Sequence, residues 1–406
     1  MVITERKKLL IYKVLIIIFA FVIAFLPSTA SRNREVNSRI IVEMIGLDEK
    51  DGNIEVTAQY VMPTETEGAT TKDKVKVSAK TVTQAVESLS TALGRRAELG
   101  HCSMLILGSE LKPHTLASLM TGTDVTADVY VSAATESAGE LVGDLTDFMK
   151  KSGTTDADFI AYSAKRSHIA TTTLLNFLSD IKSASKTATV PIVELIEEEG
   201  GQSGEQSGGD SGSSSGGGES GGSGGGSGGD GGSSGGGQKQ PIGMKTEKLA
   251  LYNDEARIGV LEKQSSRGVA WICPTVEKSV VCADIEYDGK KYEGVSGYLA
   301  RKQVNMKIDK KSKACTVEVS VRIDPKCDKF NFINTSSDGK AREAIKQGFE
   351  QQIKSELISG FGESLNLGAD PMKIAKKFYR YAPKLNVTAE TLGEVAVNFD
   401  VKVEIN

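Results

Sequence analysis

The first folded stretch of the chain largely alternates apolar and polar residues on either side of a turn signal. Apolar side chains recur at about every second position of 39–47 and 54–61, and Asp51 and Gly52 stand between these stretches. A period of two is typical of half-buried strands, and Asp-Gly is a favoured pair in tight turns. The pattern predicts a β-hairpin, followed by a short strand at 74–79.

The period changes after this strand. Apolar residues recur every three or four positions from Val82 to Leu93, which predicts an amphipathic helix that Thr81 or Thr83 can cap. The same two periods predict further elements: buried strands at 104–107 and 129–131, helices at 116–120, 137–149 and 172–181, and an extended segment at 188–195.

Alternation returns in the second half of the chain. Strands at 249–252 and 257–261 flank an Asn253-Asp254 turn, and the apolar run 269–272 predicts a third strand. The remaining pattern predicts strands at 280–287, 298–306 and 316–323, a long helix at 341–357, a short helix at 372–378 and a last strand at 395–405. The apolar seam of the long helix is interrupted at Gln352. Hairpins mixed with helices indicate an α+β fold rich in antiparallel strands, not a doubly wound parallel sheet.

Between the two halves lies a stretch with nothing to bury. Residues 200–237 are almost entirely glycine and serine with a few acids, and none is apolar. Such a composition cannot offset the entropy of ordering the chain, so it predicts a flexible coil. The coil either separates two domains or interrupts one, and residues alone leave both arrangements open.

The start of the chain carries an export signal. The apolar run 14–26 follows Arg6, Lys7, Lys8 and Lys13, and precedes the small residues 28–30. This arrangement fits a cleaved signal peptide, and counted from residue 9 it also fits an uncleaved membrane anchor. In both cases the basic side stays in the cytoplasm and the rest of the chain lies outside it.

Charge and reactive residues narrow the possible functions. The formal net charge is −4, which argues against a nucleic-acid surface. The five cysteines, at 102, 273, 282, 315 and 327, show no C-x-x-C spacing, so zinc and redox motifs are not indicated; 273/282 and 315/327 are near enough in sequence to bridge. We expect isolated, buried thiols.

Other candidate chemistry is weak. His101, His114 and His168 have no metal partner or nucleophile at motif spacing. The oxygen-bearing residues Asp48, Asp51, Asn53 and Glu55 resemble the start of a calcium loop without its final acid, so a plain hairpin turn is the preferred interpretation. The lysines at 307, 310, 311 and 313 are interpreted as a solvated turn, with anionic lipid as the alternative. The sequence predicts no catalytic, cofactor-binding or metal-binding residues.

Several stretches together resemble one family. They are Ile45-Gly-Leu-Asp48, residues 99–111, Thr173-Leu-Leu-Asn-Phe-Leu with Val190-Pro191, the hairpin 248–261, and Leu367-Gly-Ala-Asp370-Pro-Met. In this order they are similar to the Ger(x)C spore germination proteins, the C subunits of nutrient germinant receptors in spore-forming Firmicutes. The resemblance runs from about residue 40 to the C-terminus.

The resemblance implies a fold and a setting. It implies three small α+β domains, which we place at 36–155, 156–275 and 276–406, after a signal peptide or anchor at 1–30 and with a disordered insertion at 200–240 in the middle domain. It also implies a subunit on the outer face of the spore inner membrane, beside integral membrane subunits of which one is permease-like. The family has no known active site to carry over. This chain lacks the family's usual lipoprotein cysteine, since no cysteine precedes Cys102, and the coil is not part of the family pattern.

The expected function is a non-enzymatic, membrane-associated receptor subunit required for spore germination, without cofactor and without direct capture of the nutrient. The alternative is an extracytoplasmic small-ligand-binding or sensor protein. An exported hydrolase using His101 or His168 is the third class.

Overall fold

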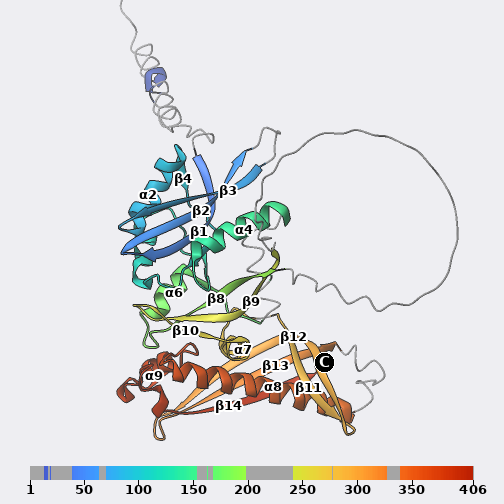
Figure 1. The fold of residues 1–406 in the computed structure, drawn as a ribbon. Coiled ribbons are helices and arrows are strands. Elements are labelled where there is room, and N and C mark those ends of the chain that lie inside the picture. The colour runs from blue at the N-terminus through green and yellow to red at the C-terminus, as the bar shows by residue number, and fades with distance from the viewer. Residues whose placement is uncertain are drawn as a thin grey trace, which may run out of the picture.

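The computed structural model describes residues 13–16, 19, 39–63, 70–152, 162, 168–197, 241–276, 278–326 and 339–405. Most of the predicted signal or anchor segment and the whole coil at 200–240 lie outside these residues. Among the residues described, no helix is both long enough and apolar enough to cross a membrane. The fold is mixed α+β, as the pattern predicted, and it is built on two sheets (Figure 1).

The larger sheet, sheet A, has strands in the order β10-β9-β8-β6-β5-β1-β2-β3, with β4 beside β1 and β7 beside β6. Its strands are β1 Arg39–Lys50, β2 Asn53–Pro63, β3 Thr70–Ala79, β4 Arg96–Glu98, β5 Met104–Leu107, β6 Tyr130–Ala133, β7 Thr172–Thr173, β8 Ala188–Glu197, β9 Pro241–Tyr252 and β10 Arg257–Leu261. The predicted hairpin around Asp51 and Gly52 is confirmed, and both turn residues have positive φ. Residues 36–155 and 156–275 thus contribute strands to one sheet; their division into two domains stays a prediction.

The smaller sheet, sheet B, has the order β11-β12-β13-β14. Its strands are β11 Val280–Tyr287, β12 Lys290–Asp309, β13 Ala314–Lys326 and β14 Ala396–Ile405. The first three form the predicted antiparallel meander, and β14 joins β13 in parallel.

The helices of the two parts are α2 Val82–Leu93, α3 Ala117–Gly122, α4 Ala138–Ser152, α6 Leu174–Ile181, α7 Lys263–Ile272, α8 Gly339–Asn366 and α9 Ile374–Tyr381, with short 3₁₀ turns η2 Pro113–Leu116, η4 Pro383–Leu385 and η5 Leu392–Glu394.

Helices cover both faces of sheet A and one face of sheet B. The apolar residues of α2 and α6 belong to one core with sheet A, and those of α4 belong to a second core with Met44 and Met104. Thr81 caps α2 through its side chain, as predicted. The long helix α8 lies along sheet B, and its buried residues Ile345, Phe349 and Ile353 share a core with β13 (Figure 1).

The glycine-serine stretch is inserted into a hairpin. Strands β8 and β9 pair antiparallel from Ala188↔Tyr252 out to Glu197↔Pro241, so the two ends of the inserted stretch lie at neighbouring strand ends. The stretch therefore interrupts sheet A and does not mark the border between the two sheets. Of the two arrangements that the sequence left open, this geometry supports a coil that interrupts one domain.

One predicted strand is wrong. Residues 269–272 belong to helix α7, not to a third strand. The helix is short and buried on nearly every side: Ser265, Gly268, Val269 and Trp271 are all buried. When a short helix is buried on nearly all sides, its apolar residues form a continuous run and not one at every third or fourth position. Such a run looks the same in the sequence as a buried strand.

Candidate functional site

The histidines that the sequence singled out do not meet. His101 and His114 are exposed on the first half of the chain, whereas His168 is completely buried beside helix α7. Among the described residues, no three His, Cys, Asp or Glu side chains are grouped so that they could hold a metal ion.

The calcium candidates have structural roles. The carboxylate of Asp48 accepts hydrogen bonds from Ala138 N at 2.8 Å, Gly139 N at 2.8 Å and Ser137 Oγ at 3.1 Å. Asp48 therefore caps the first turn of α4, where the helix dipole favours a negative charge. Asp51 lies in the tight turn between β1 and β2. The preferred interpretation as a hairpin turn agrees with this geometry.

The cysteines are free thiols where the structure describes them. Cys102, Cys273, Cys282 and Cys315 form no disulfide, and Cys327 lies outside the described residues. Cys102 and Cys315 are buried as expected, but Cys273 is only partly buried and Cys282 is exposed, which corrects the expectation for these two. Burial raises the pKa of Cys273 and raises that of Cys315 to about 11, with the charge of Asp370 adding to the effect at Cys315. These two thiols are therefore protonated at neutral pH and are weak nucleophiles.

The lysine run lies in and beside the turn that joins β12 to β13. Lys310 and Lys311 are exposed there. Lys307 forms an ion pair with Glu318, and Lys313 forms one with Glu394 at 2.6 Å. The interpretation as a solvated turn fits this arrangement.

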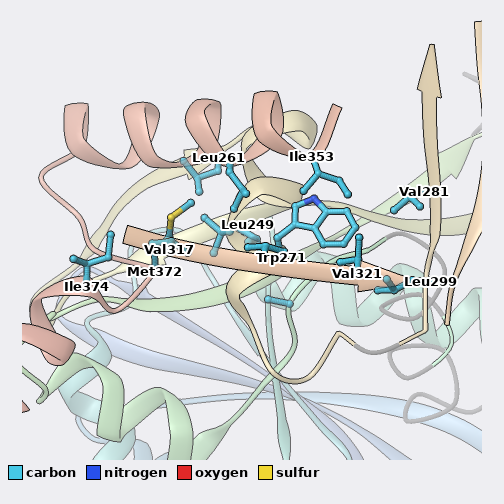
Figure 2. Close-up of a cluster of buried hydrophobic side chains, with 14 of the residues drawn as sticks. Leu249, Leu261, Trp271, Val281, Leu299, Val317, Val321, Ile353, Met372 and Ile374 are labelled. Carbon is cyan, nitrogen blue, oxygen red and sulfur yellow. The ribbon is translucent and has the colours of Figure 1, made fainter. Parts of the chain in front are cut away.

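The most unusual polar groups lie where sheet A meets sheet B. Strand β9 contributes to two cores at once, because Ala250 and Tyr252 face the core with α6 while Leu249 and Leu251 face the core of sheet B. Figure 2 shows Leu249 and Trp271 beside Ile353 of α8. We call this contact of β9, β10 and α7 with α8 and sheet B the junction.

A buried charge lies at the centre of the junction. Glu356 of α8 is 1% exposed and accepts a hydrogen bond from Trp271 Nε1 at 2.7 Å and another from Gln352 Nε2 at 3.0 Å. Arg267 Nε lies 3.3 Å from Glu356 Oε1 and balances its charge. Burying a carboxylate without such partners would destabilise the folded protein. The contacts of Glu356 with Trp271 and Arg267 therefore favour one particular packing of α7 against α8. The sequence signal for it is Gln352, which lies one turn before Glu356 on the apolar seam.

The two helices of the junction touch through small residues. A Cβ at Gly268 would lie 1.9 Å from the Glu356 carbonyl oxygen, and one at Gly360 would lie 2.7 Å from the Ser265 carbonyl oxygen. The hydroxyls of Ser265 and Ser359 are 2.7 Å apart. Only helices with small residues at the crossing can approach this closely, and this explains why α7 is rich in Ser, Gly and Ala.

His168 is part of the same packing. Its ring centroid lies 4.0 Å from that of Trp271, and its Nδ1 is 2.6 Å from Ser279 Oγ. Burial lowers the pKa of His168 well below 6.5, and the charges of Arg267 and Lys302 lower it further, so the ring is neutral. Although Ser279 and His168 have the spacing of a nucleophile and its base, both are buried and Nε2 has no hydrogen-bond partner in the described structure. A substrate has no access to the pair.

A second buried carboxylate ties the loop after α6 to α9. Asp370 is 1% exposed and accepts hydrogen bonds from Ser185 Oγ at 2.6 Å, Ala375 N at 2.7 Å and Ile374 N at 2.9 Å. Burial raises the pKa of Asp370 to about 6, and these hydrogen bonds oppose the rise. Nearby, Asp180 forms ion pairs with Lys373 and Lys376.

Two of the stretches that carry the family resemblance, the hairpin of β9 and β10 and the stretch from Leu367 to Met372, meet at this junction. Leu367 packs against Gly259, where a Cβ would lie 2.7 Å from the Leu367 side chain. Asp370 belongs to the same stretch as Leu367, and Gly259 belongs to the hairpin of β9 and β10. These two motifs therefore serve the contact between the sheets, which the sequence did not predict because their residues are more than 100 positions apart.

Beside the junction lies a cleft of about 620 Å³ whose lining includes Lys278, Arg301, Lys302 and Lys377 around the apolar side chains of Val304 and Met306. We call it the basic cleft. None of the described residues that line it is acidic. Its four cations produce a positive potential that attracts negatively charged groups.

Comparison with known proteins identifies the family. Residues 32–195 match the spore germination protein N-terminal domain, and residues 247–406 match the spore germination B3/GerAC-like C-terminal domain. A search of solved structures finds similarity to a chain described as the crystal structure of the GerBC protein, with 10% identity, a TM-score of 0.42, and coverage of 89% of this chain and 96% of that one. No curated protein matches. The two family matches together span more than half of the sequence, and the chain belongs to the Ger(x)C family of spore germination proteins, the C subunits of nutrient germinant receptors.

Proposed function

We propose that this protein works in spore germination as a membrane-associated, extracytoplasmic receptor subunit that catalyses no reaction. The observation that carries the proposal is the pair of family matches on either side of the glycine-serine stretch, at 32–195 and 247–406. The apolar run 14–26 behind a basic start supports export and membrane association.

The junction supports a mechanical role. Its buried residues include the apolar side chains around Trp271 and the compensated charge of Glu356. An interface that is buried and rich in apolar groups holds its two sides in one arrangement, unlike the smaller polar interfaces that let domains move. The subunit would therefore present both sheets to its partners as one body.

The partners follow from the family. We propose that the protein lies on the outer face of the spore inner membrane and contacts integral membrane subunits, one of them permease-like. The nutrient itself is recognised elsewhere in the complex. We also propose the division into domains at 36–155, 156–275 and 276–406, with the last two joined through the junction.

Gene deletion tests the proposal. Spores of the deletion strain should fail to respond to at least one nutrient, measured as the fall in optical density of the suspension, and the intact gene should restore the response. As a control, a trigger that bypasses nutrient receptors should still germinate the mutant spores. Normal germination of the mutant with every nutrient, in a strain without a second copy of the gene family, would contradict the proposal.

Membrane fractionation tests the location. The protein should be found with the inner membrane of dormant spores and should be accessible to protease only from the outer side. Recovery in the soluble spore core would overturn the proposed location while leaving the role in germination open to the deletion experiment.

A further inference from the structure

The basic cleft concentrates positive charge on a protein that is acidic overall. The chain has a formal net charge of −4, yet Lys278, Arg301, Lys302 and Lys377 line one cavity, and none of its described lining residues is acidic. Like charges brought together repel one another, so an arrangement of this kind is stabilised when an anion occupies it.

Two cations at the rim have no carboxylate partner among the residues that the structure describes. Within the described part of the chain, neither Lys278 nor Arg301 forms an ion pair, although neighbouring lysines of the same sheet do: Lys307 pairs with Glu318 and Lys313 pairs with Glu394. Lys307 and Lys313 are thus neutralised locally, whereas the charges of Lys278 and Arg301 are not balanced by any carboxylate in the described part of the chain.

The other two cations are held in place. Lys302 Nζ donates hydrogen bonds to the carbonyl oxygens of Ala270 and Cys273 at the C-terminal end of α7. Lys377 Nζ lies 4.7 Å from the centre of the Tyr381 ring. A positioned side chain loses less entropy when a ligand binds than a free one does, so these contacts prepare the cleft for binding.

One edge of strand β12 beside the cleft has no neighbouring strand among the described residues, so its backbone groups add to the polarity of the cleft. Strand β11 pairs with β12 only as far as Val280↔Tyr298, and from Ala300 onward β12 has β13 as its only strand partner among the described residues. Residues of this part of β12, including Ala300, Arg301 and Asn305, line the cleft. The side chains of Val304 and Met306 supply apolar surface for the body of a small ligand.

We propose that the basic cleft binds an anionic ligand that carries carboxylate or phosphate groups. The same chemistry is offered by a soluble multivalent anion and by an anionic lipid headgroup. The inference rests on the cleft alone, and it stands whether or not the protein proves to be a receptor subunit.

Titration of the full-length purified protein tests the inference. The soluble probes are citrate and pyrophosphate, followed by isothermal titration calorimetry at low ionic strength. The membrane probes are phosphatidylglycerol vesicles and phosphatidylcholine vesicles, followed by co-sedimentation. We expect saturable binding of at least one anionic probe, weakened by added salt because the contacts are ionic.

Two charge-matched variants give the decisive comparison. The double variant Lys278→Gln with Arg301→Gln removes two positive charges from the cleft, whereas Lys310→Gln with Lys311→Gln removes two from the exposed turn of the same sheet. The cleft variant should lose roughly tenfold or more in affinity, the effect of removing charge-assisted contacts. The turn variant should keep the wild-type affinity within about twofold. All four positions are on the surface, and unchanged melting temperatures would show that both variants are folded.

The outcomes separate the sources of the anion. Saturation by citrate or pyrophosphate with loss in the cleft variant assigns a soluble anion, and saturation only by phosphatidylglycerol vesicles with the same loss assigns a lipid headgroup. The inference is overturned if no anionic probe saturates, or if both double variants weaken binding equally, since the attraction would then be general and not local to the cleft.

Discussion

The indole nitrogen of Trp271 donates a hydrogen bond to the carboxylate of Glu356 at 2.7 Å, and the two side chains are 0% and 1% exposed. The bond joins α7, which follows sheet A, to α8, which covers sheet B. Because both groups are cut off from water, losing either partner leaves the other unsatisfied. The contact therefore fixes how the two parts of the protein are arranged.

Replacing Glu356 with Gln should destabilise the protein strongly. The amide can still accept from Trp271, but it leaves the charge of Arg267 buried without compensation. We expect a loss of about 3 kcal/mol in the free energy of unfolding, measured by denaturant titration. Glu343→Gln, the same change at an exposed site of α8, should cost less than about 0.5 kcal/mol. Equal effects of the two changes would contradict the role given to Glu356.

Two glycines of α8 should respond in opposite directions to alanine. A Cβ at Gly360 meets the backbone of α7 at 2.7 Å, so Gly360→Ala must push the helices apart at a cost of about 1 to 3 kcal/mol. A Cβ at Gly362 meets nothing within 4 Å, so Gly362→Ala should stabilise the helix by about 0.5 to 1 kcal/mol. Melting temperatures of the two variants provide the measurement, and shifts of the same sign would rule out the close helix crossing.

Asp370 should make stability fall with rising pH. Its pKa is raised from 3.8 to about 6 in the folded protein, so between these values the folded state binds more protons than the unfolded state. Its stabilising contribution is therefore fully present below about pH 4 and is lost as the pH rises through about 6, by at most about 3 kcal/mol.

Asp370→Asn should remove this component of the pH dependence. The measurement is the difference in unfolding free energy between wild type and variant across pH 4 to 7, with the exposed Asp400→Asn as control. A difference between wild type and Asp370→Asn that does not change with pH would contradict the raised pKa.

Removing the inserted stretch should leave the fold intact. The ends of the insertion lie at the paired residues Glu197 and Pro241, and loop-closure entropy rises only with the logarithm of loop length. Excising 202–236 should change the free energy of unfolding by no more than about 1.5 kcal/mol, in the stabilising direction. A clear drop in melting temperature would show that the stretch takes part in folding.

Ser279→Ala distinguishes a structural pair from a catalytic one. The change removes the hydrogen-bond partner of His168 Nδ1 in a buried site and should cost about 1 to 3 kcal/mol of stability. If the protein catalyses no reaction, spores that carry the variant at normal protein level should still germinate with the nutrient. Complete loss of germination at normal protein level would favour the hydrolase alternative.

Much of the fold could be read from local pattern. The hairpin at Asp51 and Gly52, the helix capped by Thr81 and the alternating last strand were all predicted and are confirmed. These elements each have one buried and one exposed face, so their period is visible in the sequence. Helix α7 was missed because it is buried on nearly all sides, which removes that period.

The sequence alone was therefore enough to predict the family, from short motifs in a fixed order, and the mixed α+β class, from the periodicity of apolar residues. The pairing of Trp271 with Glu356, the capping of α9 by Asp370 with the help of Ser185, and the gathering of lysines in the basic cleft were decided by the tertiary structure. These groups come from segments far apart in the sequence. Their chemistry depends on burial and on distances that arise only when the two sheets pack together.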